Sequence, residues 1–307
     1  MLKKLLLYLS QASWARAIAT HFFVTRRMAQ RFIAGETSQQ AITTTQDLNR
    51  QGLSVTLDYL GESVARAQDT IEVVDTYRAI IEAIHAHNLN ATISLKPTHL
   101  GLDIDRSLCI DNIKGLTTLA HQYGIGVTFD MESSAYVDVT LNIYRHLRDD
   151  LGLDNVGTVI QSMLYRSQND MKQLAGEGAR IRLVKGAYLE PKTVAHPDKA
   201  DVDNAYIAIM RDYLKHPAPA LLEVATHDDR MIHTTIDFVE QHGIPADRYE
   251  FQMLYGIRNA RQLELAQQGH PTRVYVPFGA AWYPYFMRRL AERPANLWFL
   301  LSSLFKS

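Results

Sequence analysis

The sequence contains very little cysteine and no long hydrophobic run. Cys109 is the only cysteine among 307 residues, which excludes a disulfide framework and a zinc site built from several thiolates. No stretch approaches the ~20 apolar residues of a membrane-spanning helix. The formal net charge of -1 gives no basis for a general nucleic-acid-binding surface, so we expect no nucleic-acid partner. A reducing, cytoplasmic setting fits these features.

Several catalytic signatures are absent as well. No Gly-x-Gly-x-x-Gly turn follows a strand-like segment, which argues against a doubly wound dinucleotide-binding sheet. No Gly-x-Ser-x-Gly turn is present, which argues against a serine hydrolase. No histidines and carboxylates have the spacing of a zinc protease site, so we expect no metal.

The N-terminus is similar to the start of a secretion signal. Lys3 and Lys4 precede a short leucine-rich run, and residues 17–19 imitate a cleavage site. The apolar run is too short and Arg16 interrupts the pattern, so we do not expect secretion. An amphipathic helix on a membrane surface is one interpretation of this segment, and packing against the core is the favoured one.

Strand-like and helix-like segments alternate regularly along the chain. Apolar, β-branched runs are typical of parallel strands buried on both faces. Eight such runs predict an α/β fold of the (βα)8 barrel type over residues 51–307, preceded by a helical segment over residues 1–50. A doubly wound sheet is the alternative. The expected strands are Ser54–Tyr59, Ala91–Leu95, Gly126–Asp130, Gly157–Gln161, Arg180–Val184, Leu221–Ala225, Tyr249–Leu254 and Arg273–Val276.

Amphipathic stripes predict helices between these strands. The first stripe consists of Ile71, Val74, Tyr77, Ile81 and Ile84. Further helices are expected at Ile110–Leu119, Ser134–Arg148, Asp203–Leu214, Asp229–Gln241 and Asn259–Gln267, and a terminal one at Leu297–Phe305.

Polar residues occur at the carboxyl end of every expected strand, where barrels of this kind place their active sites. Two enzyme classes remain open from these residues alone. Asp130 and Glu132 are a candidate acid/base pair, and Lys96 and Lys185 are candidates for a Schiff-base aldolase. The polar strand-end residues are Asp58, Lys96, Asp130, Gln161, Arg182, Lys185, Thr226, His227, Asp228, Gln252, Tyr255 and Tyr275.

A double arginine marks the helix expected after the last strand, with Pro284 in its first turn. Arg288 and Arg289 diverge on a helix, so they share a target only if it lies close above it. Each guanidinium group matches two oxygens, which suits a small carboxylate or a phosphate. A solvated pair that contacts Glu292 is the alternative, but the neighbouring aromatic residues favour a partly desolvated site.

These residues belong to longer motifs in a fixed order. The motifs are Ser94–Thr98, Phe129–Glu132, Ile160–Ser162, Arg182–Tyr188, Ala225–Asp228, Phe251–Gly256, Tyr275–Gly279, Trp282–Tyr285 and Arg288–Glu292. In this order they resemble the bacterial proline dehydrogenases, whose relatives form one domain of bifunctional proline-utilisation proteins. The resemblance extends from Thr25 onward.

The resemblance implies a distorted barrel whose eighth helix lies over the barrel mouth. It also implies noncovalently bound FAD and the oxidation of L-proline to Δ1-pyrroline-5-carboxylate by hydride transfer to flavin N5, the first step of proline catabolism to glutamate. A membrane quinone is the expected electron acceptor, which allows a peripheral contact with the inner face of the cell membrane. A pyrroline-5-carboxylate dehydrogenase is the expected downstream partner.

The resemblance also assigns residues to the substrate. Arg288 and Arg289 would grip the proline carboxylate with Lys96 as a third cation, which fixes the ring in a reactive orientation. Tyr255 and Tyr275 would pack against the ring. The bulky Tyr275 phenol favours proline over 4-hydroxyproline.

A second group is assigned to catalysis and to the flavin. Asp130 would anchor Lys96, and Arg182 would approach flavin N5, where a cation favours the reduced form. Glu292 would pair with a cation of the clamp when the lid closes. The flavin would be held by Met131, Gln161, Arg182, Lys185, Gly186, Ala187, Thr226 and His227.

Overall fold

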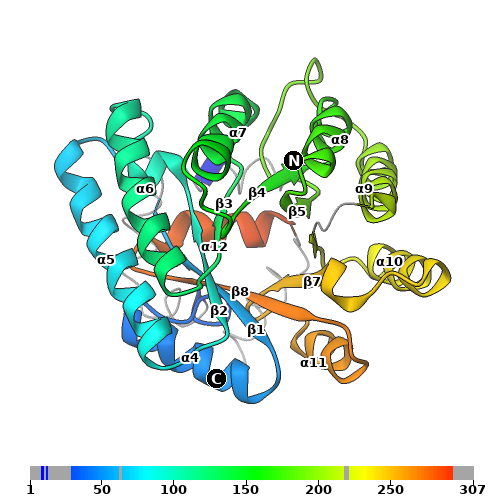
Figure 1. The fold of residues 1–307 in the computed structure, drawn as a ribbon, viewed down its shortest axis with the longest axis horizontal. Coiled ribbons are helices and arrows are strands. Elements are labelled where there is room, and N and C mark those ends of the chain that lie inside the picture. Colours follow the sequence, from blue (N-terminus) through cyan, green and yellow to red (C-terminus); the bar gives the residue numbers. More distant parts are fainter. Residues whose placement is uncertain (1–7, 10–11, 13–28, 62–63, 218–220, 293–307) are drawn as a thin grey trace.

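The computed structural model describes residues 8–9, 12, 29–61, 64–217 and 221–292. Eight parallel strands close into a barrel in chain order, with helices outside it (Figure 1). The predicted barrel is confirmed, and four of its strands begin and end where the sequence predicted. The strands are β1 (Ser54–Tyr59), β2 (Ala91–Leu95), β3 (Val127–Phe129), β4 (Val156–Gln161), β5 (Arg180–Val184), β6 (Leu222–Ala225), β7 (Tyr249–Leu254) and β8 (Thr272–Phe278).

The helices begin and end where local chemistry favours it. Asp105 and Asp228 accept backbone N–H bonds as caps of α6 and α10, and Gly243 ends α10 in the left-handed conformation. The sequence missed α8, which carries few apolar residues. The helices are α4 (Ser38–Arg50), α5 (Ala67–Ala86), α6 (Arg106–Gln122), α7 (Val137–Arg145), α8 (Ser167–Gly176), α9 (Lys199–Lys215), α10 (Asp229–His242), α11 (Asn259–Gln267) and α12 (Trp282–Glu292).

Two helix predictions need correction. The helix expected at Ser134–Arg148 is divided into a 3-10 turn, α7 and a π-helical turn at His146–Asp150. On α5, Ile71 was expected on the buried face, but 49% of it is exposed. The buried face instead includes Val73 and Ile80, because the side chains that meet the barrel are set by the tilt of the helix on the strands.

Some expectations fall on other parts of the chain. The N-terminal segment with its membrane-surface interpretation and the tail Leu297–Phe305 lie outside the described residues. Among the helices that the structure describes, none has both the length and the apolarity to cross a membrane. The division of the chain at residue 50 stays a prediction, although α4 packs directly on β1 and β8.

The barrel interior is polar at alternate strand positions. The hydroxyls of Thr56 and Thr92 lie 2.8 Å apart on β1 and β2, and Arg182 of β5 donates across the barrel to Ser94 of β2. Because side chains alternate between the faces of a strand, the apolar residues between these positions face the helices. The expectation of strands that are apolar along their whole length is therefore wrong for the inner face.

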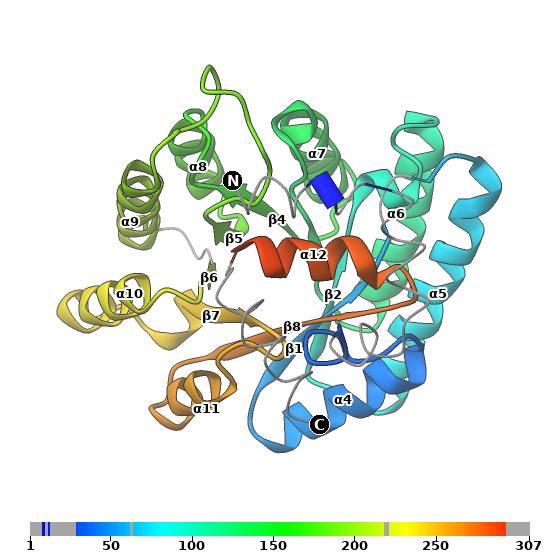
Figure 2. The same ribbon diagram turned by 180° about the vertical axis from the view of Figure 1, so that it is seen from behind.

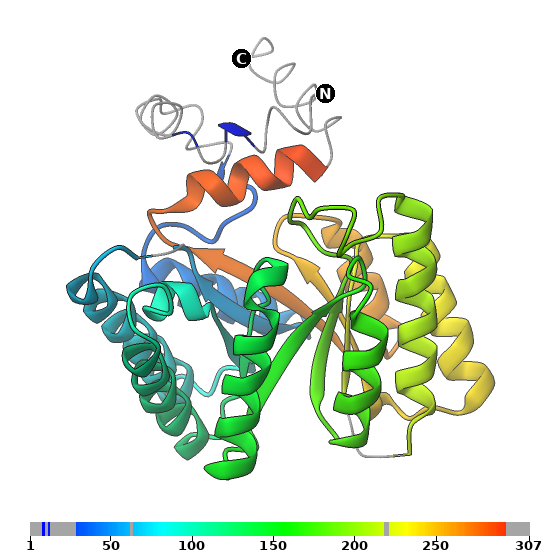
Figure 3. The same ribbon diagram turned by 90° about the horizontal axis from the view of Figure 1, so that it is seen from above.

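Helix α12 crosses the end of the barrel at which β8 finishes (Figures 2 and 3). It packs on the segment 29–35, with Phe32 and Phe286 ring centroids 6.1 Å apart. The segment is joined to the chain before α12, because the Ala34 N–H donates to Pro277 O and the Gly279 N–H donates to Gly35 O. The eighth helix thus lies over the barrel mouth, as expected.

Gly256 permits the close approach of the segment 29–35 to the chain after β7, and a substitution tests this contact. Gly256 has φ +73°, and a Cβ there would lie 1.6 Å from the carbonyl oxygen of Arg31. We expect Gly256→Ala to lower the free energy of unfolding by more than the ~1–2 kcal/mol of a left-handed alanine, and to speed tryptic cleavage after Arg31. The matched control is Gly269→Ala, with φ +86° and nothing within 4 Å of its Cβ. Equal urea denaturation curves for the two variants would contradict the prediction.

Candidate active site

Asp130 is the centre of a buried hydrogen-bond network at the carboxyl end of the barrel. Its Oδ1 accepts from Ser94 Oγ and Arg182 Nη1, both at 2.8 Å. Its Oδ2 accepts from the Tyr275 hydroxyl at 2.6 Å and lies 3.3 Å from Lys96 Nζ. Burial opposes ionisation, but Lys96 and Arg182 outweigh it and hold the pKa of Asp130 below its usual value. The Asp130 carboxylate therefore accepts hydrogen bonds from Ser94, Arg182 and Tyr275 and orders the residues around it.

Lys96 is held between two carboxylates. Its Nζ lies 2.6 Å from Asp58 Oδ1 and 3.3 Å from Asp130 Oδ2. Burial alone would lower the pKa of Lys96, but the two carboxylates raise it well above its usual value. An imine-forming lysine must lose its proton, so Lys96 fits a fixed cation and not a Schiff-base nucleophile.

Lys185 is engaged in the same way on the other side of the barrel. Its Nζ lies 2.6 Å from Asp203 Oδ1 and 2.7 Å from Asp228 Oδ2. Both lysines of the aldolase alternative are thus in ion pairs.

Arg182 is buried and bonded along one edge. Its Nε donates to Gln252 Oε1 at 2.7 Å and to Glu223 Oε2 at 3.2 Å, and its Nη1 donates to Asp130 and Ser94. The guanidinium also lies over the Tyr275 ring, 5.2 Å from the centroid. Its Nη2 is buried and has no hydrogen-bond partner in the part of the chain that the structure describes. A buried donor of this kind calls for an acceptor, which a bound molecule at the mouth would supply.

Glu132 does not form the acid/base pair that its position near Asp130 suggested. Its two carboxylate oxygens accept from the Thr98 N–H at 3.2 Å and from Thr98 Oγ1 at 2.7 Å. Burial raises the pKa of Glu132. Its carboxylate joins the chain after β3 to the chain after β2, and so holds the segment that carries Lys96.

The predicted flavin residues lie along β3 to β6. Gln161 Nε2 donates to the Glu132 carbonyl at 2.8 Å, and Met131 is packed in the barrel core. Gly186 has φ +106°, a backbone conformation that favours glycine, and it precedes the exposed Ala187.

The end of β6 supplies two more of these residues. The His227 Nε2 accepts from the Leu254 N–H at 2.9 Å, and Thr226 Oγ1 accepts from the Asp228 N–H at 3.1 Å. These bonds fix both side chains at the rim.

The predicted arginine pair lies over the mouth but on a separate element. Arg288 and Arg289 are partly buried on α12, and the Arg289 guanidinium lies 5.1 Å from the Tyr285 ring centroid. Tyr255 bonds to β8 through its backbone, where its N–H donates to Tyr275 O at 2.9 Å. The side chain of Glu292 lies outside the described residues, so its pairing stays a prediction.

This arrangement agrees with comparisons to known proteins. A family model described as proline dehydrogenase matches residues 41–301. The chain belongs to the proline dehydrogenase family. It is an oxidoreductase of proline metabolism, and the resemblance seen in the sequence is confirmed.

Two relatives match this chain along most of its length. Proline dehydrogenase 1 of Bacillus subtilis (strain 168) is 42% identical over 306 residues, which cover 100% of both chains. Proline dehydrogenase of Deinococcus radiodurans is 44% identical over 282 residues, which cover 91% of this chain and 90% of that protein.

Solved structures share the fold. Proline utilization A from Bdellovibrio bacteriovorus, inactivated by N-propargylglycine, has a TM-score of 0.79 at 24% identity over 87% of this chain. Proline utilization A from Corynebacterium freiburgense has a TM-score of 0.75 at 20% identity over 94% of this chain. The match covers 32% and 33% of those chains, so this chain spans about a third of their length.

Sequence reasoning overlooked three residues of the network. Asp58 was noted at its strand end without a role, and Ser94 and Glu223 were assigned none. A periodicity of two would have found Asp58 and Ser94, because polar residues recur at every second position of β1 and β2. Glu223 alone interrupts the apolar run of β6.

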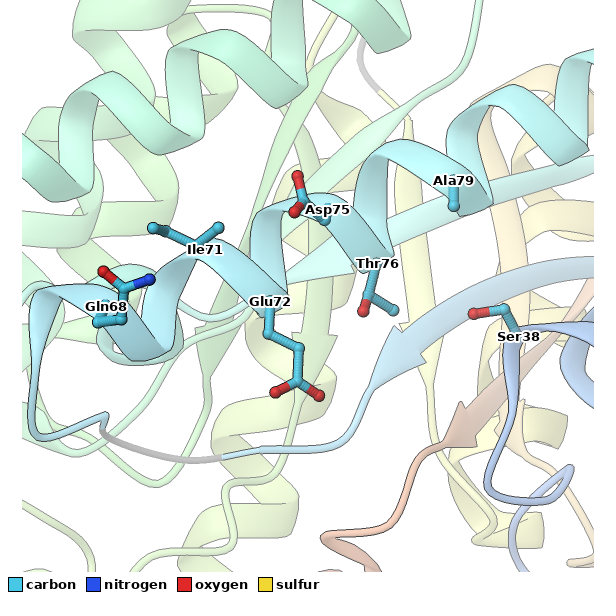
Figure 4. Close-up of a pocket in the computed structure, with 7 residues that line it drawn as sticks. All are labelled: Ser38, Gln68, Ile71, Glu72, Asp75, Thr76 and Ala79. Carbon is cyan, nitrogen blue, oxygen red and sulfur yellow. The ribbon is translucent and has the colours of Figure 1, made fainter.

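A groove among the described residues lies away from this network. It lies on the outer surface, where α5 contributes Glu72 and Asp75 and the start of α4 contributes Ser38 (Figure 4). It belongs to the helical layer and contains none of the network residues.

A buried histidine beside the site predicts a pH dependence of stability. His99 is 5% exposed, and burial together with the positive charge of Lys96 lowers its pKa from 6.5 to about 4. In the unfolded chain this histidine becomes protonated as the pH falls below 6.5. In the folded protein His99 stays neutral until about pH 4. The contribution of neutral His99 to the free energy of unfolding is therefore complete above pH 6.5. It is lost as the pH falls from 6.5 towards 4.

We expect a loss of up to about 3 kcal/mol between pH 7.5 and 4.5 from this residue. Urea denaturation of the parent and of His99→Gln at several pH values measures this loss. The difference between their free energies of unfolding should change as the pH falls from 7.5 to 4.5. The exposed His87→Gln serves as the control. Parallel pH profiles for the parent and His99→Gln would contradict the assignment.

Proposed function

We propose that this protein binds FAD noncovalently and oxidises L-proline to Δ1-pyrroline-5-carboxylate. The observation that carries the proposal is Arg182, a buried guanidinium group whose Nη2 has no hydrogen-bond partner among the described residues. It is supported by the membership in the proline dehydrogenase family.

The substrate carboxylate would be bound by Lys96, Arg288 and Arg289. Lys96 stays charged because Asp58 and Asp130 pair with it, so its charge is available without a proton-transfer step. The arginines add two-oxygen recognition from the lid. Tyr275 is oriented by its bond to Asp130, which fixes the position of its phenol against the proline ring and excludes a ring hydroxyl.

The cofactor-binding residues fit a flavin. Bound FAD would supply the chemistry by accepting a hydride from proline and passing the electrons to a quinone. Arg182 would offer its Nη2 to the reactive edge of the ring system as an ordered donor with little reorganisation. Met131, Gln161, Lys185, Gly186, Ala187, Thr226 and His227 would hold the rest of the cofactor. Asp203 and Asp228 orient Lys185 toward this task.

The partners would be a membrane quinone and a dehydrogenase that consumes the product. A quinone dissolved in a membrane requires that the protein reach the membrane surface, so we include a peripheral contact with it. The product is an imine in equilibrium with an aldehyde, which a pyrroline-5-carboxylate dehydrogenase would consume.

The absorption spectrum of the purified protein tests the function. We expect flavin bands that bleach on anaerobic addition of L-proline and are released as FAD by heat. Protein that stays colourless after reconstitution with FAD, or a flavin spectrum that proline leaves unchanged, would refute the proposal. A borohydride-trapped adduct with a carbonyl substrate would favour the aldolase alternative.

The clamp is tested by Arg288→Lys and Arg289→Lys. Each change keeps the charge but removes the fork that binds two oxygens. A hydrogen bond to a charged group contributes about 1.5–3 kcal/mol, so we expect the KM for proline to rise about tenfold or more. Flavin content should remain that of the parent. Arg145→Lys, on the outer helix α7, is the control, and kinetics equal to this control would show that the clamp is misassigned.

A further inference from the structure

Glu223 is a buried carboxylate to which the proposed function gives no role. It lies on β6, and 2% of its side chain is exposed. Its Oε2 lies 3.2 Å from Arg182 Nε and its Oε1 lies 3.3 Å from Arg180 Nη1. Glu223 therefore bridges two arginines of the neighbouring strand β5 on the inner face of the barrel.

This bridge fixes the direction of the Arg182 guanidinium. The group is planar and rigid, so bonds at two of its nitrogens determine where the third one lies. Nε is bonded to Glu223 and Gln252, and Nη1 is bonded to Asp130 and Ser94. Nη2, for which residues 29–61, 64–217 and 221–292 supply no hydrogen-bond partner, is thereby held in one orientation.

Glu223 also reduces the positive charge presented by Arg182. Burial opposes its ionisation, but Arg180 and Arg182 outweigh burial and hold the pKa of Glu223 below its usual value. A full negative charge thus lies within hydrogen-bond distance of the guanidinium. Few water molecules screen it there, so its effect is larger than at the surface.

We propose that Glu223 is a positioning residue that aims Arg182 Nη2 at the bound flavin and sets the reduction potential of that flavin. The inference rests on the proposed function, because it requires a flavin beside Arg182. Removal of the Glu223 charge leaves the positive charge of Arg182 less compensated, which stabilises the reduced flavin with its additional negative charge.

The test is the midpoint potential of the purified flavoprotein, measured by spectroelectrochemistry for the parent and for Glu223→Gln. We expect the potential to rise, with the equilibrium between oxidised and reduced flavin changing about tenfold, or about 30 mV for a two-electron couple. Glu223→Asp keeps the charge and should restore most of the parent potential. An unchanged potential in Glu223→Gln would overturn the inference.

A double-mutant cycle separates positioning through Arg182 from a general electrostatic effect. In an Arg182→Met background, Glu223→Gln should shift the potential clearly less than in the parent, because only the direct effect of the Glu223 charge on the flavin remains. A shift of the same size in that background would overturn the positioning role. Asp170→Asn is the matched control, since Asp170 is a buried acid of the outer helix α8 that accepts from Arg166 Nε at 2.7 Å. A shift in this control as large as that of Glu223→Gln would also count against the inference.

Arg180→Gln provides a second route if Glu223→Gln does not fold. Loss of Arg180 leaves Glu223 to Arg182 alone, so the potential should fall instead of rise, and a rise would overturn the inference. Failure of the two ideas is distinguishable. Colourless protein after reconstitution refutes the proposed function, whereas a proline-reducible flavin whose potential is insensitive to these changes refutes only the role of Glu223.

Discussion

One partly buried carboxylate organises the barrel mouth. Asp130 follows β3 and is bonded by Ser94 of β2, Arg182 of β5, Tyr275 of β8 and, as an ion pair, by Lys96. Removing one partner from a buried pair typically costs about 3–5 kcal/mol, because the remaining charge is left uncompensated. These groups therefore hold one another in place before any ligand binds, which is the kind of preorganisation that electrostatic catalysis requires.

The two faces of the barrel strands carry different kinds of side chain. Apolar side chains face the helices and form the large core, with residues such as Val55, Ile93 and Val224 fully buried. The inner face instead carries charged residues such as Arg180 and Glu223. Buried ion pairs add little net stability, so we infer that the helical layer supplies the stability and that the interior supplies the fixed orientation of the site.

The sequence predicted much of the fold and the location of the site. Alternating apolar runs and helices were sufficient for eight strands, because each run had to be buried on both sides. The polar residues at the strand ends could be located once the strand boundaries had been predicted. The half-exposed Ile71 and the missed helix α8 show where the method fails, since the face that a helix buries depends on its neighbours. The sequence located Glu132 near the carboxyl end of β3, but its hydrogen bond with Thr98 could not be predicted from the spacing of the residues.

The sequence by itself determined the barrel, the family and the set of polar residues that surround the mouth, because periodicity and ordered motifs are local properties of the chain. The tertiary structure decided which of these residues meet. Arg182 reaches Ser94 across 88 positions, and Tyr275 reaches Asp130 across 145. Only closure of the barrel brings such distant residues within hydrogen-bond distance, and closure also turned Lys96 from a candidate nucleophile into a fixed cation between two carboxylates.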